Sequence, residues 1–279
     1  MPELPEVETV VRTLRQAILG ATISRVVFAS RRVGMGNARG WKGSLAGSEI
    51  VSISRRGKYI DVNLGSRGHL IMHMRMTGRF RLYPISKKRE KYDRLILSIN
   101  GGMLNEPSLL TLVDTRQFAR ADYLPTTSTR SHPGIGKLGP EADHITETEL
   151  RRILAKSKRP IKALLLDQTA IAGLGNIYAD ECLHAAGIHP LASCELVDRA
   201  QIRRLRSGVQ RILTAAIEAC GTTFDTFSDL SGEAGGFAPY LHVYSRTGQP
   251  CLSCGSMIER IVLSGRSTHF CPSCQPHAG

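Results

Sequence analysis

The first six residues of the chain, MPELPE, place a proline at position 2 and a glutamate at position 3. Methionine before a small residue such as proline is normally removed, which leaves Pro2 as a secondary amine at the terminus. An α-amine has a pKa of about 7.7–8.0, so a useful fraction is neutral near pH 7.5. Such an amine can attack a sugar carbon to form a lasting iminium, while Glu3 protonates a ring oxygen or moves a proton. The alternative is a plain leader into an amphipathic helix, because apolar residues recur at helical spacing from Val7 to Ile18.

Four cysteines near the end of the chain form two close pairs. Cys251 and Cys254 are separated by two residues, as are Cys271 and Cys274. The gap between the pairs suits a β-hairpin, so four sulfurs can close a tetrahedron around one structural Zn²⁺ rather than form disulfides. The tip of this hairpin would present Arg266, which is otherwise a solvated surface charge.

A basic stretch, RRILAKSKRPIK, precedes the motif AGLGNIY. The stretch holds six cations and no acid: Arg151, Arg152, Lys156, Lys158, Arg159 and Lys162. The glycines before Asn176 let backbone N–H groups approach a ligand at a helix N-terminus, a geometry that binds phosphate. Together they predict a grip on a DNA backbone, which positions the duplex without reading its sequence. The alternative for the basic residues is a solvated helix face.

Two further motifs, HMRMTG and VDTRQF, combine apolar residues with arginine. Arg116 and Phe118 are predicted to share a strand face, and Met76 could be a core residue because it alternates with Met72 and Met74. Apolar wedges accompanied by arginine are also how proteins fill a duplex after a base leaves the stack.

Composition bounds the class of protein. The chain has 279 residues, of which 42% are hydrophobic, so it can bury a core. Its net charge of +13 favours an anionic partner, most commonly nucleic acid. We expect an intracellular protein, because no segment approaches the roughly 18 apolar residues of a membrane span and the acidic start does not fit a signal peptide. Its seven cysteines, an odd number in a chain expected to be intracellular, argue against a disulfide framework.

The elements that must position these residues fall into three predicted domains. Residues 1–135 read as a helix followed by short strands, which indicates an antiparallel sandwich or barrel. Residues 136–240 read as helices, with capping boxes at Thr146 and Asp198 and a Gly-rich loop over 221–240 that is typical of a lid. Residues 241–279 form the four-cysteine unit.

Seven motifs, in order along essentially the whole chain, resemble the formamidopyrimidine-DNA glycosylase family of bacterial enzymes that excise oxidised purines. They are PELPEVET, RRGKY, HMRMTG, DTRQF, GLGNIYADE, GRSTHFC and the terminal cysteines. The resemblance implies an α+β multidomain fold, with an N-terminal antiparallel β-sandwich flanked by helices, a helix–two-turn–helix domain and a C-terminal zinc-finger hairpin.

The resemblance also implies roles for single residues. It makes Pro2 the nucleophile at C1′, Glu3 the acid that opens the deoxyribose, and Glu6 a supporting carboxylate. Lys58 matches a loop lysine that contacts phosphate and assists proton transfer. The remaining matches are residues that would contact DNA: Met76, Arg116 and Phe118 in the gap left by the flipped nucleotide, Asn176 and Arg266 on phosphates beside the lesion, and Lys158 and Lys162 on the DNA side.

On this resemblance we expect a glycosylase that also cleaves the strand at the abasic site, acting on 8-oxoguanine and formamidopyrimidines in double-stranded DNA. A cytoplasmic, nucleoid-associated monomer is expected, with one structural zinc and no membrane partner.

The chain departs from the family pattern at a few positions. Tyr92 stands where the family usually has a histidine that touches DNA, Gln117 replaces a common basic residue, and the segment 100–112 looks longer than usual. Two alternatives stay open. One is the sister enzyme for oxidised pyrimidines, which usually has a glycine at the position of Leu4; the other is a zinc-containing damage-binding protein without catalysis.

Overall fold

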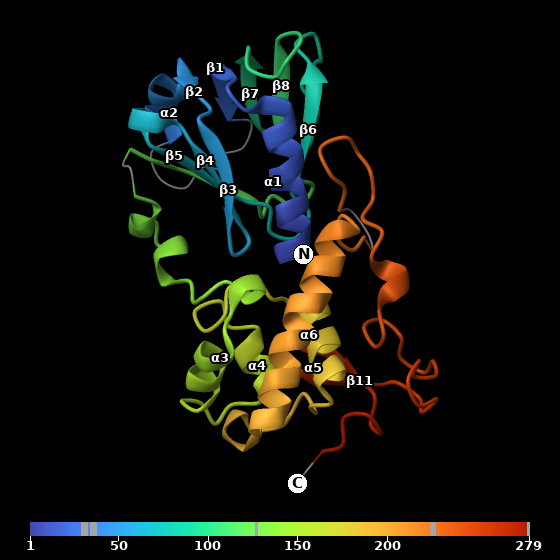
Figure 1. The fold of residues 1–279 in the computed structure, drawn as a ribbon. Coiled ribbons are helices and arrows are strands. Elements are labelled where there is room, and N and C mark those ends of the chain that lie inside the picture. Colours follow the sequence, from blue (N-terminus) through green and yellow to red (C-terminus); the bar gives the residue numbers. More distant parts are fainter. Residues whose placement is uncertain (29–32, 34–37, 126–127, 224–226, 278–279) are drawn as a thin grey trace. The chain divides into compact units, whose positions relative to one another are not determined.

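The computed structural model describes residues 1–28, 33, 38–125, 128–223 and 227–277 (Figure 1). The chain forms two compact units, Met1–Gly136 with Ala219–Gly236, and Lys137–Glu218 with Phe237–Gly279. Among the helices of the described residues, none combines the length and the apolar character that crossing a membrane requires.

The first unit contains helix α1 (Leu4–Ile18) and two antiparallel sheets. One sheet has the order β2 (Ser48–Glu49), β1 (Thr22–Phe28), β7 (Asp93–Asn100), β8 (Ser108–Val113), β6 (Arg79–Pro84). The other has the order β3 (Ser52–Arg56), β4 (Tyr59–Asn63), β5 (His69–His73), β9 (Arg120–Leu124). Helix α2 (Ala38–Leu45) follows β1, and the short 3-10 helices are η1 (Gly65–Arg67), η2 (Thr129–Ser131) and η3 (Ile135–Lys137), the last reaching one residue into the second unit.

One apolar core holds α1 and both sheets of this unit together. It includes Val7 and Leu14 from α1, Leu70 from β5 and Leu97 from β7, all at most 2% exposed. Each such side chain contributes about 1.5–3 kcal/mol through burial. The predicted β-sandwich is therefore confirmed, and α1 is fixed to it along its apolar face.

The second unit holds the helices α3 (Glu147–Leu154), α4 (Ile161–Leu165), α5 (Asn176–Ala186) and α6 (Arg199–Glu218), and the hairpin of β10 (Glu259–Leu263) and β11 (Arg266–Phe270). Its 3-10 helices are η4 (Ala142–His144), η5 (Cys194–Leu196) and η6 (Ala238–Tyr240). The predicted caps are confirmed. Thr146 and Glu149 form a capping box at α3, and Asp198 bonds reciprocally with Gln201 before α6.

The loop predicted as a lid, 221–240, is only partly described, because residues 224–226 lie outside the described residues. Its ends meet in an antiparallel bridge between Thr222 and Gly236. Arg81 of β6 donates to the Asp229 carbonyl at 2.5 Å. By its contacts the segment Ala219–Gly236 therefore belongs with the first unit, whereas the sequence-based boundaries group it with the helices.

Candidate active site and nucleic-acid interface

The start of α1 is a capping box built from two glutamates. Glu3 is the N-cap residue, and its N–H donates to the Glu6 carboxylate at 2.7 Å. Both side chains are buried, at 3% and 2% exposure, and Pro2 is buried beside them. Pro5 fits the first turn because backbone N–H groups there have no intrahelical acceptor. Two carboxylates thus supply the helix cap that a Ser, Thr or Asp residue more commonly provides.

The Glu6 carboxylate also binds the first residues of the 221–240 loop. Its Oε1 accepts the Thr222 N–H at 2.7 Å. Gly221 has a φ of +85°, and a Cβ there would lie 2.9 Å from this same oxygen. A side chain at position 221 would therefore displace Glu6, a constraint that no local pattern reveals.

Lys58 lies in the tight turn between β3 and β4 and is 5% exposed. Arg55 of the same hairpin forms an ion pair with Glu8 of α1 at 3.1 Å, which ties the hairpin to the helix that carries Glu3. Burial lowers the pKa of His73 to about 3, and the charges of Arg75 and Lys58 add to the effect. A neutral imidazole therefore lies within the electrostatic reach of Lys58.

In the first unit, the residues predicted to enter the duplex are exposed, as is Tyr92, which is predicted to touch DNA. Met76, Phe118 and Tyr92 are 42%, 43% and 40% exposed, and the Arg116 guanidinium lies 4.8 Å from the Phe118 ring centroid. Met76 is therefore not a core residue, since β5 ends at His73 and a turn follows.

The prediction that Arg116 and Phe118 share a strand face is wrong. Both lie in the connection between β8 and β9, where Gln117 has a φ of +59°. The Asp114 carboxylate accepts the N–H groups of residues 116 and 119, which folds the segment into a turn instead of a strand.

In the second unit, Asn176 and the zinc-finger hairpin meet at one carbonyl. Asn176 is the first residue of α5, after the extended N-cap Gly175, and its Nδ2 donates to the Ser267 carbonyl at 2.8 Å. An amide nitrogen carries two hydrogens, and this bond uses one of them. Arg266 precedes Ser267 and is exposed at the tip of the hairpin, as predicted from the sequence.

The predicted basic residues separate into exposed and buried ones. Lys158 is exposed and lies 3.9 Å from Glu195. Lys162 is wholly buried, 2.6 Å from Asp180, and donates to Thr268 Oγ1 at 2.8 Å. A direct contact of Lys162 with DNA does not agree with this position, because its ammonium group is enclosed by protein. The other cations of the stretch are exposed: Arg151, Arg152, Lys156 and Arg159.

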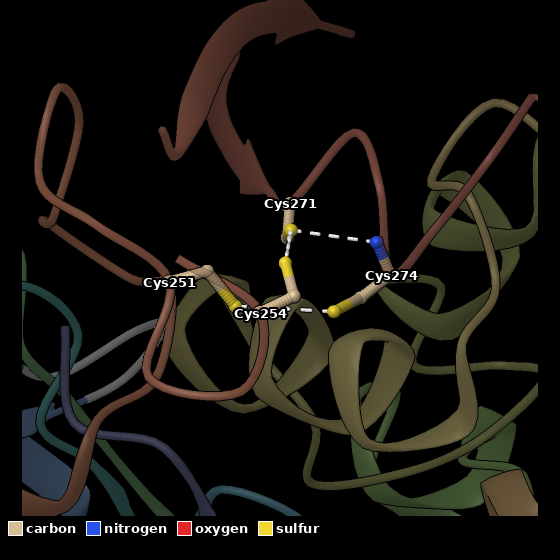
Figure 2. A group of neighbouring side chains, drawn as sticks. All are labelled: Cys251, Cys254, Cys271 and Cys274. Carbon is tan, nitrogen blue, oxygen red and sulfur yellow. Dashed lines mark hydrogen bonds between the residues drawn. The ribbon is translucent and has the colours of Figure 1, made fainter. Parts of the chain in front are cut away.

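The four predicted zinc ligands converge in the second unit (Figure 2). All four sulfur atoms lie within 4.8 Å of one another. The Cys254–Cys271 sulfurs are 3.4 Å apart and the Cys251–Cys274 sulfurs 3.9 Å, too far for disulfides. Neighbouring sulfurs around a tetrahedral zinc would be about 3.8 Å apart, for Zn–S bonds of about 2.3 Å.

The groups around the cluster act differently on its thiols, since burial raises the pKa of Cys271 and of Cys274. Hydrogen bonds from Ser256 lower the pKa of Cys254 to about 6. His184 Nε2 lies 3.7 Å from Cys251 Sγ, and burial lowers the pKa of His184 to about 4, which keeps the ring neutral. The donor set and spacing thus fit a closed, structural zinc site with no position left for a substrate.

Comparisons with known proteins agree with the order of these parts. Residues 1–121 match the formamidopyrimidine-DNA glycosylase N-terminal domain, residues 138–228 its H2TH domain, and residues 248–276 the zinc finger found in FPG and IleRS. The formamidopyrimidine-DNA glycosylase of Desulfitobacterium hafniense is 40% identical over 99% of this chain and 100% of that protein. That of Parasynechococcus marenigrum is 42% identical, again over 99% and 100%.

Solved structures extend the similarity to three dimensions. Lactococcus lactis Fpg in complex with DNA containing an abasic site has a TM-score of 0.91 and 37% identity, over 99% of this chain and 100% of that one. A mutant of the same Lactococcus lactis protein, in complex with DNA containing Fapy-dG, gives the same TM-score, identity and coverage. With all three domains matched in order and relatives alike over their full length, the chain belongs to the formamidopyrimidine-DNA glycosylase family.

Proposed function

We propose that this chain is a base-excision-repair DNA glycosylase for oxidised purines that also cleaves the strand at the resulting abasic site. The observation that carries the proposal is the buried start of α1, where Pro2 adjoins the paired carboxylates of Glu3 and Glu6. A protein that only binds damage has no need for a free terminal amine beside a carboxylate.

The chemistry begins once Met1 is removed. The Pro2 nitrogen, partly neutral near pH 7.5, attacks C1′ of the damaged nucleotide, and the base leaves with the bonding electrons. Glu3 protonates the ring oxygen, so the sugar opens to an iminium. Loss of a C2′ proton then expels the 3′ phosphate, and a second elimination expels the 5′ phosphate. Glu6 supports these steps by fixing the backbone of Glu3 through its 2.7 Å bond.

DNA contacts come from both units in this proposal. Met76, Arg116 and Phe118 fill the space left by the extruded nucleotide, which their exposure supports. Asn176 and Arg266 hold phosphates beside the lesion, with Lys58 and Lys158 as further cations. The net charge of +13 supports a salt-sensitive, sequence-independent component of binding. Tyr92 contacts DNA in place of the family's usual histidine.

One Zn²⁺ held by Cys251, Cys254, Cys271 and Cys274 would stabilise the hairpin that carries Arg266. We further propose that the enzyme acts as a monomer in the bacterial cytoplasm, on the nucleoid. The relatives solved with damaged DNA support the choice of partner.

The proposal is tested by incubating the mature protein with duplexes carrying defined lesions, with and without borohydride. We expect release of 8-oxoguanine and formamidopyrimidines, and a covalent adduct that maps to Pro2. The adduct should be absent in Pro2→Gly and formed much more slowly in Glu3→Gln. Glu49→Gln, an exposed carboxylate on β2, serves as the matched control and should behave as wild type.

Three outcomes would contradict the proposal. Preferred release of oxidised pyrimidines would favour the sister enzyme. Binding without excision or trapping would favour a damage sensor. Trapping by a protein that mass spectrometry shows to retain Met1 would exclude the proline amine as nucleophile.

A further inference from the structure

Apart from Lys58, the residues expected to contact DNA in the first unit lie on three separate connections of the sandwich. Met76 lies between β5 and β6, Tyr92 between β6 and β7, and Arg116 and Phe118 between β8 and β9. All three connections meet at Asp114, which is 0% exposed. We propose that Asp114 is a positioning residue that sets the mutual arrangement of these side chains. The inference rests on the proposed function, because it concerns how the same residues enter DNA.

The Asp114 carboxylate binds two of the three connections directly. Its Oδ1 accepts the Thr77 hydroxyl, one residue after Met76, and the Arg116 N–H at 3.1 Å. Its Oδ2 accepts the Ala119 N–H at 2.8 Å, one residue after Phe118. The two oxygens therefore bracket the Arg116–Phe118 segment and connect it to the Met76 turn.

The backbone of Asp114 binds the third connection. Its N–H donates to the Tyr92 carbonyl at 3.0 Å. Its carbonyl accepts Arg94 Nε at 2.7 Å, and the Arg94 guanidinium lies 5.7 Å from the Tyr92 ring centroid. The main chain of Tyr92 is thus bound by Asp114 itself, and its ring lies near Arg94, which also binds Asp114.

The turn before Met76 and the Arg116–Phe118 segment each contain a backbone conformation that needs stabilising contacts. Arg75 and Gln117 have φ values of +56° and +59°, a region that side chains other than glycine seldom occupy. Such conformations persist only when surrounding contacts determine them. The Arg75 N–H donates to His73 Nδ1 at 2.9 Å, and the bonds at residues 116 and 119 enclose Gln117. Without the Asp114 carboxylate we expect the backbone at Gln117 to relax and the Phe118 side chain to change direction.

The test compares Asp114→Asn with Phe118→Ala and with the double variant. An amide replaces one accepting oxygen by a donor, so at least one of the three bonds is lost. We expect each single variant to weaken binding to a duplex with an abasic-site analogue by at least about tenfold. Because both act through the same wedge, the double variant should lose little more than either single variant. On a single-stranded abasic oligonucleotide there is no gap to fill, so borohydride trapping by Asp114→Asn should stay near the wild-type rate.

Controls keep the outcomes distinct. Asp61→Asn removes another largely buried carboxylate of this unit, one that bonds His69 at 2.7 Å, and should leave duplex binding unchanged. Should Asp114→Asn fail to fold, Thr77→Val removes only the bond to the Met76 turn and is expected to weaken duplex binding in the same selective way. If Phe118→Ala has no effect on binding, the proposed wedge fails. If Phe118→Ala weakens binding but the Asp114 or Thr77 effect is additive to it, or extends equally to single strands, the positioning role is overturned.

Discussion

A buried carboxylate in each unit, Asp114 in the first and Asp180 in the second, binds segments that carry expected DNA contacts, but the two are satisfied differently. Asp114 of the sandwich accepts from Thr77, Arg116 and Ala119, all uncharged donors. Asp180 of α5 instead forms a fully buried ion pair with Lys162 and accepts the His269 N–H at 2.9 Å. The first arrangement shapes loops on a large apolar core, whereas the second attaches a hairpin to a helix.

This difference indicates how strongly each region depends on its buried polar contacts for stability. The sandwich has an extensive core besides Asp114, so losing a polar bond should alter loop geometry more than stability. In the second unit, the zinc-finger segment packs around a small apolar cluster, composed of Val243, Cys251, Ile258 and Cys271 with Cys274 against it. We therefore expect the order of this segment to depend on the Lys162–Asp180 pair and on the proposed zinc.

The largest expected effect comes from metal removal. A structural zinc supplies apparent binding energy on the order of 10 kcal/mol to folding. Chelation, or Cys271→Ser, should expose the amides of β10 and β11 while β7 and β8 stay protected. Hydrogen exchange on the full chain measures this contrast. Equal loss of protection in both units would remove the distinction drawn here.

The next largest effect is expected from Lys162→Met. Removing one partner of a buried pair leaves an uncompensated charge, which typically costs about 3–5 kcal/mol. The free energy of unfolding from denaturant titration should fall by this amount, and exchange at the His269 amide should quicken. Adding Asp180→Leu should recover part of the loss. No recovery in the double variant would show that packing, rather than the unpaired charge, is responsible.

A moderate effect on the stability of the sandwich is expected at acid pH, because of His73. Burial lowers the pKa of His73 from 6.5 to about 3, so the unfolded chain binds a proton that the folded chain does not. This contribution is complete above about pH 6.5, and stability then falls by up to about 1.4 kcal/mol per pH unit as pH drops toward 3. His73→Gln, which keeps an acceptor for the Arg75 N–H, should flatten urea-unfolding stability over that range. An unchanged slope would assign the acid sensitivity to other groups.

The smallest effect on stability is expected from Thr77→Val, at about 1 kcal/mol, because Asp114 keeps its two backbone donors. Thermal unfolding should register a modest drop. A loss as large as that of Lys162→Met would mean that Asp114 supports the core as well as the loops, which would erase the contrast between the two carboxylates.

The parts of the fold that the sequence predicted are those set by local chemistry. The Thr146 and Asp198 caps and the paired cysteines each act within a few residues. The burial of Lys162 could not be predicted in this way. Its partners are Asp180, on the following helix, and Thr268, more than a hundred positions along the chain. A basic neighbourhood looks the same in sequence whether one of its cations faces DNA or protein.

In the candidate site, too, features set by neighbouring residues could be predicted and features set by distant residues could not. The motif at Pro2 and Glu3 is readable because adjacent residues share the proposed chemistry. The bond from Thr222 to Glu6 spans most of the chain and leaves no local signal. Asp114 is inconspicuous in the sequence because its neighbours Arg116 and Phe118 carry the prominent side chains, while a turn-forming aspartate is common in any loop.

The early start of α1 has a practical consequence for making the protein. Only Glu3 separates Pro2 from the first helical residue, so no flexible segment lies between them that could compensate for extra residues at the terminus. Each added residue moves the terminal nitrogen by up to about 3.5 Å. Affinity tags therefore belong at the opposite end of the chain, and accurate choice of the start codon by the ribosome would be part of assembling the proposed nucleophile.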